Sequence, residues 1–530
     1  MNRISYIVAL LILLVCTSVG QRLVVVPPNI DDQLALTIKA DSAARTAALP
    51  TQTIYMLKRD GVYPLISPID NTNYFLYVKA ESGAGYKPFL IAKENSAAKI
   101  VQTFNFRSSG KLEGLTIEQR TLNGTPSNRV INVFNGSSLW VKNCEILHDR
   151  GAALALQSDS CSIYVEDCFI HSHGHPKSLG GNGRIIDVRS AAYTDSIVIR
   201  NTTFFNLSDR IIRNMTNFVN YIEFDHNTGL TNNGYHGGLQ GGKVREMKVT
   251  NNIFYNQIAY GAQFRRISGY VANSISEQTQ PENNQMFVVT IDTSYKLPVR
   301  NIVVRNNNVW WDQNYKDLWV KWKDSTKAPG IFTPTLMKLL SDSTKAYFTE
   351  PLTFQAPPAS IFKFIDSAYG FPKSTTFPEN WCFTYQEVNG LSPINTSYGT
   401  TAQSYTKGDG GFPVGDLNWY PARKTAWLAT VSGINDNIPA SIPSAFSLSQ
   451  NYPNPFNPST KITFTLPKSG NIMLKVFNTL GQEVATLVDA HYNAGSYDVN
   501  FDASSLSSGV YIYTLSSGDF VAAKKMMLVK

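Results

Sequence analysis

One short pattern recurs through the middle of the chain and limits the folds open to it. The pattern is apolar-x-apolar-x-polar-polar-x-apolar, and its copies begin at Leu139, Ile163, Ile197, Ile222, Met247 and Ile302, with a degenerate first copy, LTIEQRTL, at Leu115. The fifth residues of these copies, separated by 24, 24, 34, 25, 25 and 55 residues, are Gln119, Asn143, Asp167, Asn201, His226, Asn251 and Asn306. Alternating strand residues that return at a period near 24 and end in Asn predict the coils of a parallel β-helix.

The alternation within each copy specifies which side chains face inward. Ile197 and Ile199 are expected to point inward and to stack on the equivalent residues one coil away, about 4.8 Å along the axis. The strand turns at the fifth residue, where Asn tolerates a left-handed backbone better than most residues. The sixth residues predict an internal polar ladder of Cys144, Cys168, Thr202, Asn227, Asn252 and Asn307. In this ladder the stacked Cys144 and Cys168 are either bridged or two free thiols.

The two longest gaps predict insertions between coils. One lies around HSHGHPKSLGGNG, residues 171–183, and the other around ISGYVANSISEQTQPENNQ, residues 267–285. Insertions emerge as loops on one side of a solenoid, which is where binding sites are built.

The ends of this body, residues 21–440, carry weaker patterns. Helical periodicity from Asp31 to about Ala48 predicts a cap helix over the open first coil. YFLYVKA (residues 74–80) and KPFLIAK (residues 87–93) are interpreted as the first strands of the stack. Recognisable coils run from about residue 100 to 311, and residues 312–440 are expected to form an irregular tail packed along the helix.

The first 20 residues have the organisation of a secretory signal peptide. Arg3 precedes an eleven-residue apolar run, and Ser18 and Gly20 are small residues before the expected cleavage site. The run is too short to span a bilayer, and no later segment is apolar for 18 residues. Removing Arg3 leaves 46 basic against 39 acidic residues, a net charge of +7, with no basic arm of the kind that nucleic-acid binders carry. We therefore expect an exported protein without a transmembrane segment or a nucleic-acid partner.

The C-terminal residues, 441–530, form a separate module. About seven short alternating segments separated by turns such as PKSG, NAGS and SSGD predict a small Ig-like β-sandwich. The module resembles the C-terminal sorting domain of type IX secretion cargo through NYPNPFNPST (Asn451–Thr460), VFNTLGQEV (Val476–Val484), GVYIYTL (Gly509–Leu515) and KKMMLVK (Lys524–Lys530). The resemblance implies recognition by the type IX secretion machinery, and a secreted or outer-membrane surface location.

The body is similar to the right-handed parallel β-helix proteins of the pectate lyase-like superfamily. The similarity rests on the coil pattern and on LKRDGVY (Leu57–Tyr63), and it is nearest to the branch with chondroitinase-B-like and alginate-lyase-like enzymes. It implies an all-β, right-handed solenoid, but fold alone does not establish function.

A lyase that acts on an acidic polysaccharide must neutralise the uronate carboxylate, remove the C5 proton and protonate the leaving oxygen. Basic residues follow successive Asn turns in RIIDVR, RIIR, GGLQGGKVR and QFRR. We expect Lys243 to act as the base, Arg265 as the neutralising group and His236 as a substitute acid or base. The residues expected to bind the substrate are Arg184, Arg189, Arg210, Arg213 and Arg266. The alternative is that stacked Arg and Asp residues form solvated ion pairs along the solenoid.

Other candidates carry less information. His171, His173 and His175 alternate along the sequence, as metal ligands on one face of a strand would. No Cys or carboxylate stands at convincing ligand spacing. A polar loop is therefore the preferred interpretation, and no metal site is assigned. Scattered carboxylates leave Ca²⁺ undetermined as a cofactor. The tryptophans at 310, 311, 319 and 322 could stack on sugars or simply cover the last coil.

These features predict a protein that engages an extracellular, acidic polysaccharide, with uronate lyase activity as the more specific hypothesis. The main alternative is a non-catalytic β-helix that acts as a surface binder or adhesin. A third class, a β-helix glycoside hydrolase, requires clustered aspartates that the sequence does not present.

Overall fold

The computed structural model describes most of the chain outside its leader. The described residues are 21–44, 52–95, 103–121, 131–174, 183–188, 193–214, 217–232, 238–257, 287–292, 300–321, 330–358, 394–431, 446–466, 470–492, 495–518 and 520–529. The predicted signal peptide therefore lies outside the described residues.

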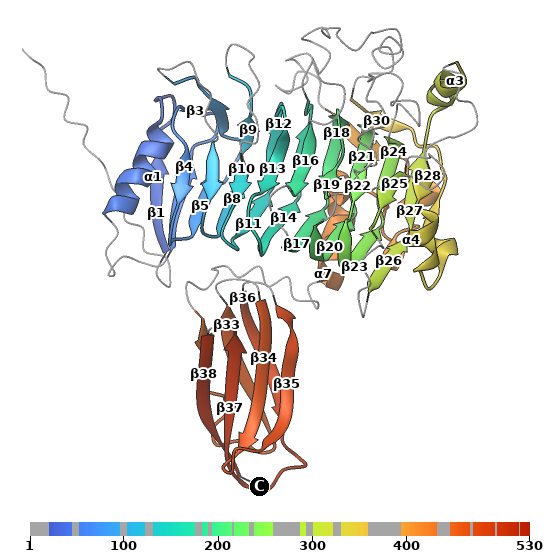
Figure 1. The fold of residues 1–530 in the computed structure, drawn as a ribbon. Helices are drawn as coiled ribbons and strands as arrows, with labels where there is room; N and C mark the ends of the chain where they lie inside the picture. Colours follow the sequence, from blue (N-terminus) through green and yellow to red (C-terminus); the bar gives the residue numbers. More distant parts are fainter. Residues whose placement is uncertain are drawn as a thin grey trace, which may run out of the picture.

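Three long parallel sheets form the body, and each coil contributes one strand to each sheet (Figure 1). Sheet A contains β1 (Gln21–Val26), β2 (Gln52–Leu57), β5 (Leu76–Ala80), β8 (Gly110–Glu113), β11 (Ser138–Lys142), β14 (Cys161–Glu166), β17 (Tyr193–Arg200), β20 (Phe218–Asp225), β23 (Lys243–Thr250) and β26 (Asn301–Arg305). Sheet B contains β3 (Val62–Leu65), β6 (Phe89–Ala92), β9 (Thr116–Glu118), β12 (Glu145–Leu147), β15 (Phe169–His171), β18 (Thr203–Leu207), β21 (Thr228–Asn232), β24 (Ile253–Gln257), β27 (Asn307–Trp310) and β29 (Tyr347–Phe348). Sheet C contains β4 (Ile69–Asn71), β7 (Phe104–Phe106), β10 (Ile131–Val133), β13 (Ala152–Leu156), β16 (Arg184–Val188), β19 (Ile212–Arg213), β22 (Leu239–Gln240), β25 (Phe287–Thr290) and β28 (Gly330–Phe332). This architecture confirms the predicted parallel β-helix.

The predicted turn residues lie where sheet A gives way to sheet B. Their φ angles are positive, between 45° and 58°, at Asn143, Asp167, Asn201, His226, Asn251 and Asn306. The prediction that Gln119 makes the turn of its coil was wrong. Thr116–Glu118 pairs with Glu145–Leu147 in sheet B, and Gly114, with φ 72°, makes the turn between β8 and β9. Apolar alternation has the same period in every strand, so LTIE matched the pattern of sheet A while belonging to sheet B.

The sixth residues form the predicted internal ladder. The side chain of Asn227 donates to Oδ1 of Asn252 (3.1 Å), and the side chain of Asn252 donates to Oδ1 of Asn307 (2.9 Å). At the other end of the ladder, Cys144 and Cys168 are buried as free thiols, so they are not bridged. Burial raises the pKa of Cys144 to about 11, which keeps this thiol protonated and unreactive.

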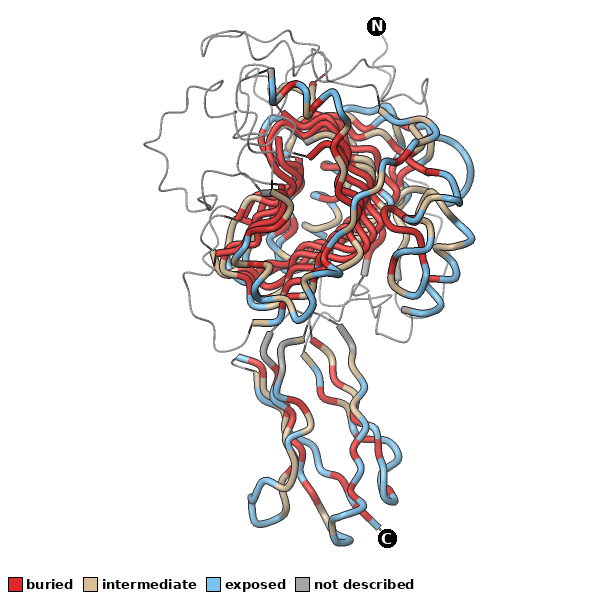
Figure 2. Tube along the Cα trace, turned by 90° about the vertical axis from the view of Figure 1, so that its right-hand side faces the viewer, coloured by how far each residue is buried: buried red, intermediate tan, exposed pale blue. Residues whose placement is uncertain are grey.

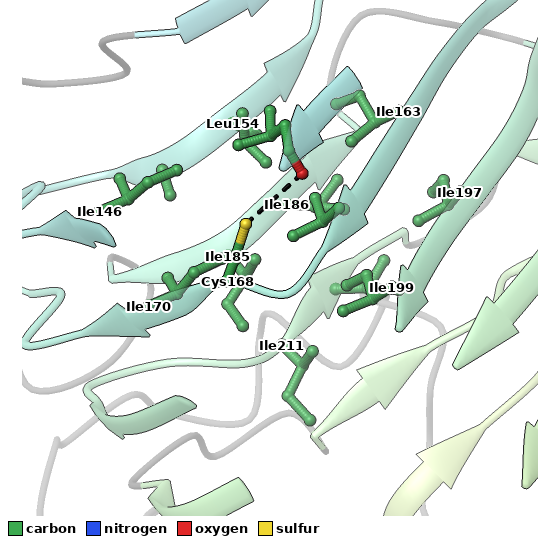
Figure 3. Close-up of a cluster of buried hydrophobic side chains, with 14 of the residues drawn as sticks. Ile146, Leu154, Ile163, Cys168, Ile170, Ile185, Ile186, Ile197, Ile199 and Ile211 are labelled. Carbon is green, nitrogen blue, oxygen red and sulfur yellow. Dashed lines mark hydrogen bonds between the residues drawn. The ribbon is translucent and has the colours of Figure 1, made fainter. Parts of the chain in front are cut away.

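Apolar side chains fill the interior of the coils. Figure 3 shows the isoleucines of successive coils around Cys168, whose thiol donates to the carbonyl of Val141 (3.4 Å). Buried residues run along the whole stack (Figure 2), and one continuous apolar cluster extends from Val26 to Ala346. Each buried Ile or Leu contributes about 1.5–3 kcal/mol, so the stacked interior is the main source of stability in the body.

The N-terminal cap forms as predicted, but the stack begins earlier than expected. Helix α1 (Gln33–Ala43) buries Leu34, Ala35 and Ile38 against the first coil. Four strands, β1 to β4, precede the segments YFLYVKA and KPFLIAK, which form β5 and β6. The first strand, QRLVVV, was not predicted because its apolar residues are consecutive rather than alternating.

The described residues after Trp311 form further short elements, some of which pack along the helix. These elements include α3 (Gln313–Lys321), α4 (Pro334–Lys338), η4 (Ser343–Lys345), β30 (Phe354–Ala356), β31 (Asn395–Tyr398), η5 (Gln403–Tyr405), η6 (Asp409–Gly411), η7 (Leu417–Trp419) and α7 (Pro421–Val431). We call residues 394–431 the C-terminal strap. Its Tyr398 and Val414 pack on the apolar outer face of sheet B, formed by Phe205, Leu230 and Tyr255. The coils continue further than predicted, because β28 and β29 extend sheets C and B beyond Trp311.

The C-terminal module is a β-sandwich with its own core. One antiparallel sheet contains β32 (Ser447–Leu448), β33 (Ser459–Leu466) and β36 (Gly495–Asp502), and the other contains β35 (Glu483–Tyr492), β34 (Gly470–Asn478), β37 (Gly509–Ser517) and β38 (Phe520–Leu528). Ile462, Phe464, Leu474 and Tyr513 are among its buried residues.

Candidate functional site

The predicted insertions share one edge of the β-helix, which we call the B–C edge because each insertion joins a strand of sheet B to a strand of sheet C. The segment around HSHGHPKSLGGNG connects β15 to β16, and the longer segment around residues 267–285 connects β24 to β25. At or near the ends of the sheet B strands that lead to this edge, left-handed residues stand at His148, Ser172, Asn206, Thr231 and Asn256. Polar residues close to this edge are therefore the natural candidates for a binding site.

Three of the predicted substrate-binding arginines lie together near this edge. Arg184 donates from Nε to Asp209 (2.8 Å) and from Nη1 to Asp187 (2.9 Å). Its side chain is 3% exposed, and both aspartates are fully buried. Burial opposes the charge of Arg184, but the two carboxylates outweigh burial and raise the pKa of Arg184 above its ordinary value.

Arg210 and Arg213 extend this cluster, which we call the Arg–Asp network. Arg210 donates to Asp209 (2.9 Å) and to Oε1 of Gln240 (2.6 Å), and its side chain is 2% exposed. Arg213 donates to Asp187 at 3.3 Å, and its side chain is 15% exposed. Burial lowers the pKa of Arg210. The arginines were expected on one solvent-facing ladder or in solvated ion pairs, and they instead form buried ion pairs, since an isolated guanidinium is too costly to bury.

The remaining predicted site residues are separate from this network or outside the described residues. Lys243 begins β23 of sheet A, where its backbone N–H donates to the carbonyl of Asn217 (3.2 Å). In the sheet register it follows Tyr193 and Phe218, whose rings stack 5.2 Å apart. The candidates Arg189, His236, Arg265 and Arg266 lie outside the described residues.

A carboxylate–histidine pair that the sequence did not predict lies on the sheet B side of the same edge. Nδ1 of His148 is 2.8 Å from Oε2 of Glu118, and both side chains are buried. Burial lowers the pKa of His148 and would raise that of Glu118, but the hydrogen bond to His148 reverses the effect and leaves the pKa of Glu118 below its usual value. The pair is therefore an ionised carboxylate beside a neutral imidazole.

The sequence did contain a signal for this pair. His148 stands five residues after the turn residue Asn143, as Ser172 follows Asp167 and Asn206 follows Asn201. Gln119 stands five residues after Gly114 and so occupies the same row as His148. A second ladder at constant offset from the first was therefore readable, but the contact between Glu118 and His148 joins different coils and was not.

The HSHGH histidines serve the fold in the described part of the chain. His173 is fully buried, with Nε2 on the carbonyl of Ile146 (3.1 Å) and Nδ1 accepting from the backbone N–H of Asp149 (3.1 Å). His171 contacts Ser172 (2.8 Å) and Glu145 (3.2 Å). His175 lies outside the described residues, and among those described no three His, Cys, Asp or Glu side chains are placed to hold a metal ion.

Two of the four tryptophans, Trp310 and Trp311, are described, and they lie near the end of the stack. Trp311 is buried and donates to the carbonyl of Gln257 (2.6 Å), and Trp310 is half-buried beneath Lys316. The side chain of Trp319 and the whole of Trp322 lie outside the described residues. The two described rings thus have the covering role rather than that of an open sugar-stacking strip.

In the sandwich, the sequence motifs shared with sorting domains meet in space. Asn451 is buried and donates two hydrogen bonds. Its backbone N–H donates to the hydroxyl of Tyr513 in GVYIYTL (2.8 Å), and its side chain donates to Thr460 at the end of its own motif (2.9 Å). The backbone N–H of Met527, in the terminal motif, donates to Asn454 (2.9 Å). The motifs therefore specify one packed end of this small domain.

Comparison with known proteins gives a result for this domain alone. No curated protein matches the chain. No helix among the described residues is long and apolar enough to cross a membrane. Residues 450–530 match the family of the secretion system C-terminal sorting domain, the type IX sorting domain, so the chain is a protein exported for secretion or attachment at the cell surface.

Proposed function

We propose that the β-helix body engages an acidic extracellular polysaccharide, and that its catalytic form is a uronate lyase. The observation that carries this proposal is that Arg184, Arg210 and Arg213 converge on the edge that also bears the long insertions. Guanidinium groups suit the planar carboxylates of uronate residues. Export brings the protein to the compartment in which such polymers occur.

The proposed chemistry is β-elimination. A base removes the C5 proton, the electron pair forms the C4=C5 double bond, and the C4–O bond breaks as the leaving oxygen takes a proton. Lys243 is the proposed base, Arg265 the group that neutralises the uronate carboxylate, and His236 a substitute proton carrier. Arg189 and Arg266 complete the proposed substrate-binding set. Ca²⁺ is an alternative neutralising group, and comparing activity with and without Ca²⁺ tests its role.

A non-catalytic binder is the second candidate, favoured by a specific observation. The described arginines are already paired with Asp187 and Asp209 in the protein interior. Such pairs join adjacent coils near the B–C edge and need not take part in a reaction. The same pairing disfavours a glycoside hydrolase built on these aspartates, because each carboxylate is already bound by two arginines in the protein interior.

The test is absorbance near 235 nm while the full chain is incubated with a panel of uronic-acid polysaccharides, with and without Ca²⁺. A lyase produces a rising signal, which Lys243→Ala should reduce by about 100-fold or more, since general-base catalysis typically contributes 10²–10⁴-fold. Lys248→Ala is the matched control, because Lys248 is an exposed lysine of the same strand. A flat trace with retention of a polymer on an affinity gel favours the binder, and a flat trace without retention contradicts the proposal for that panel.

A further inference from the structure

The Glu118–His148 pair has a geometry that the fold alone does not require. Glu118 ends β9 and His148 follows β12, one coil further along, so the pair bridges adjacent coils. Because the ionised carboxylate accepts a hydrogen bond from Nδ1–H, the neutral imidazole has its lone pair on Nε2. The Nε2 atom of His148 is therefore a hydrogen-bond acceptor.

This acceptor is buried without a partner. Among the described residues, Nε2 of His148 has no hydrogen-bond partner, although the residue is only 3% exposed. Both side-chain amide atoms of Gln119, the neighbouring residue of the same row, are also buried and unpartnered. Buried polar atoms are nearly always satisfied, so two adjacent exceptions point to a ligand group that completes them.

The backbone does not explain why a histidine stands here. His148 has a φ of 64°, and the equivalent left-handed positions in the following coils are Ser172, Asn206, Thr231 and Asn256. Small polar residues thus satisfy the same turn. The imidazole at position 148 is additional to what the turn needs.

The pair lies close to solvent and beyond the edge of the C-terminal strap. Arg120 and Glu145, which flank it, have side chains that are 27% and 20% exposed. Arg120 donates to Oε1 of Glu118 from its backbone N–H (2.8 Å) and from Nε (3.4 Å). In the described part of the chain, the strap's side-chain contacts toward this end of the helix reach Asp167 and Phe169.

The chemistry of the pair selects its ligand. A neutral Nε2 accepts a hydrogen bond, so the ligand must present a hydrogen-bond donor, and the adjacent Glu118 carboxylate repels an anionic group. A metal ion would need further ligands that the described residues do not supply. We propose that Glu118 and His148 form a subsite for a hydroxyl group of a carbohydrate ligand, which donates its hydrogen bond to Nε2 of His148. The assignment of that hydroxyl to a sugar rests on the proposed function.

The first test is nuclear magnetic resonance of the full chain labelled at its seven histidines. His148→Asn assigns the signal and retains the turn, because Asn occupies the equivalent positions 206 and 256. Addition of glucose, glucuronate or galacturonate should shift the Nε2 resonance of His148 in a saturable manner. An unchanged resonance with every sugar at saturating concentration overturns the subsite, whether or not a polymer binds elsewhere.

The second test is retention of the full chain on affinity gels that contain the polysaccharide panel. Loss of one neutral hydrogen bond should make His148→Asn bind about 2-fold to 10-fold more weakly than the unaltered chain. Thr401→Ala, at an exposed strap residue, is the control and should bind normally. Equal retention of His148→Asn overturns the subsite alone. A sugar-dependent shift of His148 without retention of any acidic polymer supports the subsite and contradicts the proposed function.

Discussion

At the scale of single residues, the interior of the β-helix depends on polar groups that satisfy one another from coil to coil. Asn252 accepts from the backbone N–H and the side chain of Asn227, and donates to Asn307 and to the carbonyl of Phe224. Each amide thus ties the turn of one coil to the next. A buried ladder of this kind is stable only when every member is paired.

Asn252→Ala should break this ladder. The substitution leaves several buried partners of Asn252 unsatisfied, so we expect the free energy of unfolding to fall by about 3 kcal/mol. Urea denaturation measures the change, with Asn301→Ala as the control because Asn301 is exposed on β26. A loss no larger than that of the control would contradict a stabilising role for the ladder.

His173 should make stability depend on pH. Burial lowers the pKa of His173 to about 3, whereas the unfolded chain binds a proton below about 6.5. The stabilisation is therefore full above pH 6.5 and is lost as pH falls, by about 3 kcal/mol between pH 6.5 and 4. Denaturation of His173→Gln at both pH values should show a smaller loss than the unaltered chain. Parallel pH profiles would show that His173 does not titrate as expected.

At the scale of elements, the C-terminal strap contacts the row of left-handed turn residues between sheets A and B. Lys424 binds Asp167 (2.6 Å), the side chain of Asn418 donates to the carbonyl of Asn201 (2.6 Å), and Trp427 lies 5.2 Å from the ring of His226. Further along, Asp409 receives hydrogen bonds from Arg305, Asn306 and Asn251. The left-handed turns therefore also form the surface on which the strap docks.

Asp409→Ala should loosen the strap while leaving the coils intact. The substitution removes the acceptor for Arg305 and for two turn asparagines. We expect hydrogen exchange of the amides in residues 403–416 to become faster by on the order of 10-fold, with unchanged protection in β20 and β23. Thr401→Ala serves as the control within the strap. Unaltered exchange in Asp409→Ala would mean that apolar packing alone holds the strap.

At the scale of the whole molecule, two parts of the chain have separate cores. The interior of the β-helix ends near Ala346, and the sandwich has a core of its own that includes Phe464 and Tyr513. A part with its own core can fold by itself. The signal for export thus lies in a domain with a core separate from that of the β-helix.

A chain that ends at residue 445 should therefore remain folded but lose its sorting signal. We expect its body to unfold at the same urea midpoint as in the full chain, because the core of the body is unchanged. In the producing cell, the truncated protein should stay inside the outer membrane, since residues 450–530 match the sorting domain. Fractionation followed by immunoblotting measures the location. Surface delivery without residues 446–530 would contradict the assigned role.

Features of short sequence range were predictable. The coil period, the left-handed turn at residues such as Asn201, the inner ladder at Asn252 and the strands of the sandwich all depend on neighbours within one strand or one coil. The same short range explains the error at Gln119, because alternation identifies a strand without saying to which sheet it belongs. For the candidate site, the insertions, the arginines and the pairing of Arg with Asp were anticipated, but the burial of these ion pairs was not.

The sequence by itself determined the solenoid, its polar turns and the export of the protein, because these follow from periodic local preferences and from contiguous motifs. Only the tertiary structure decided which distant residues meet. Glu118 pairs with His148 across 30 residues, and Asp409 reaches Asn251 across 158. Such contacts depend on how coils stack and where the strap lies, and no local pattern encodes them.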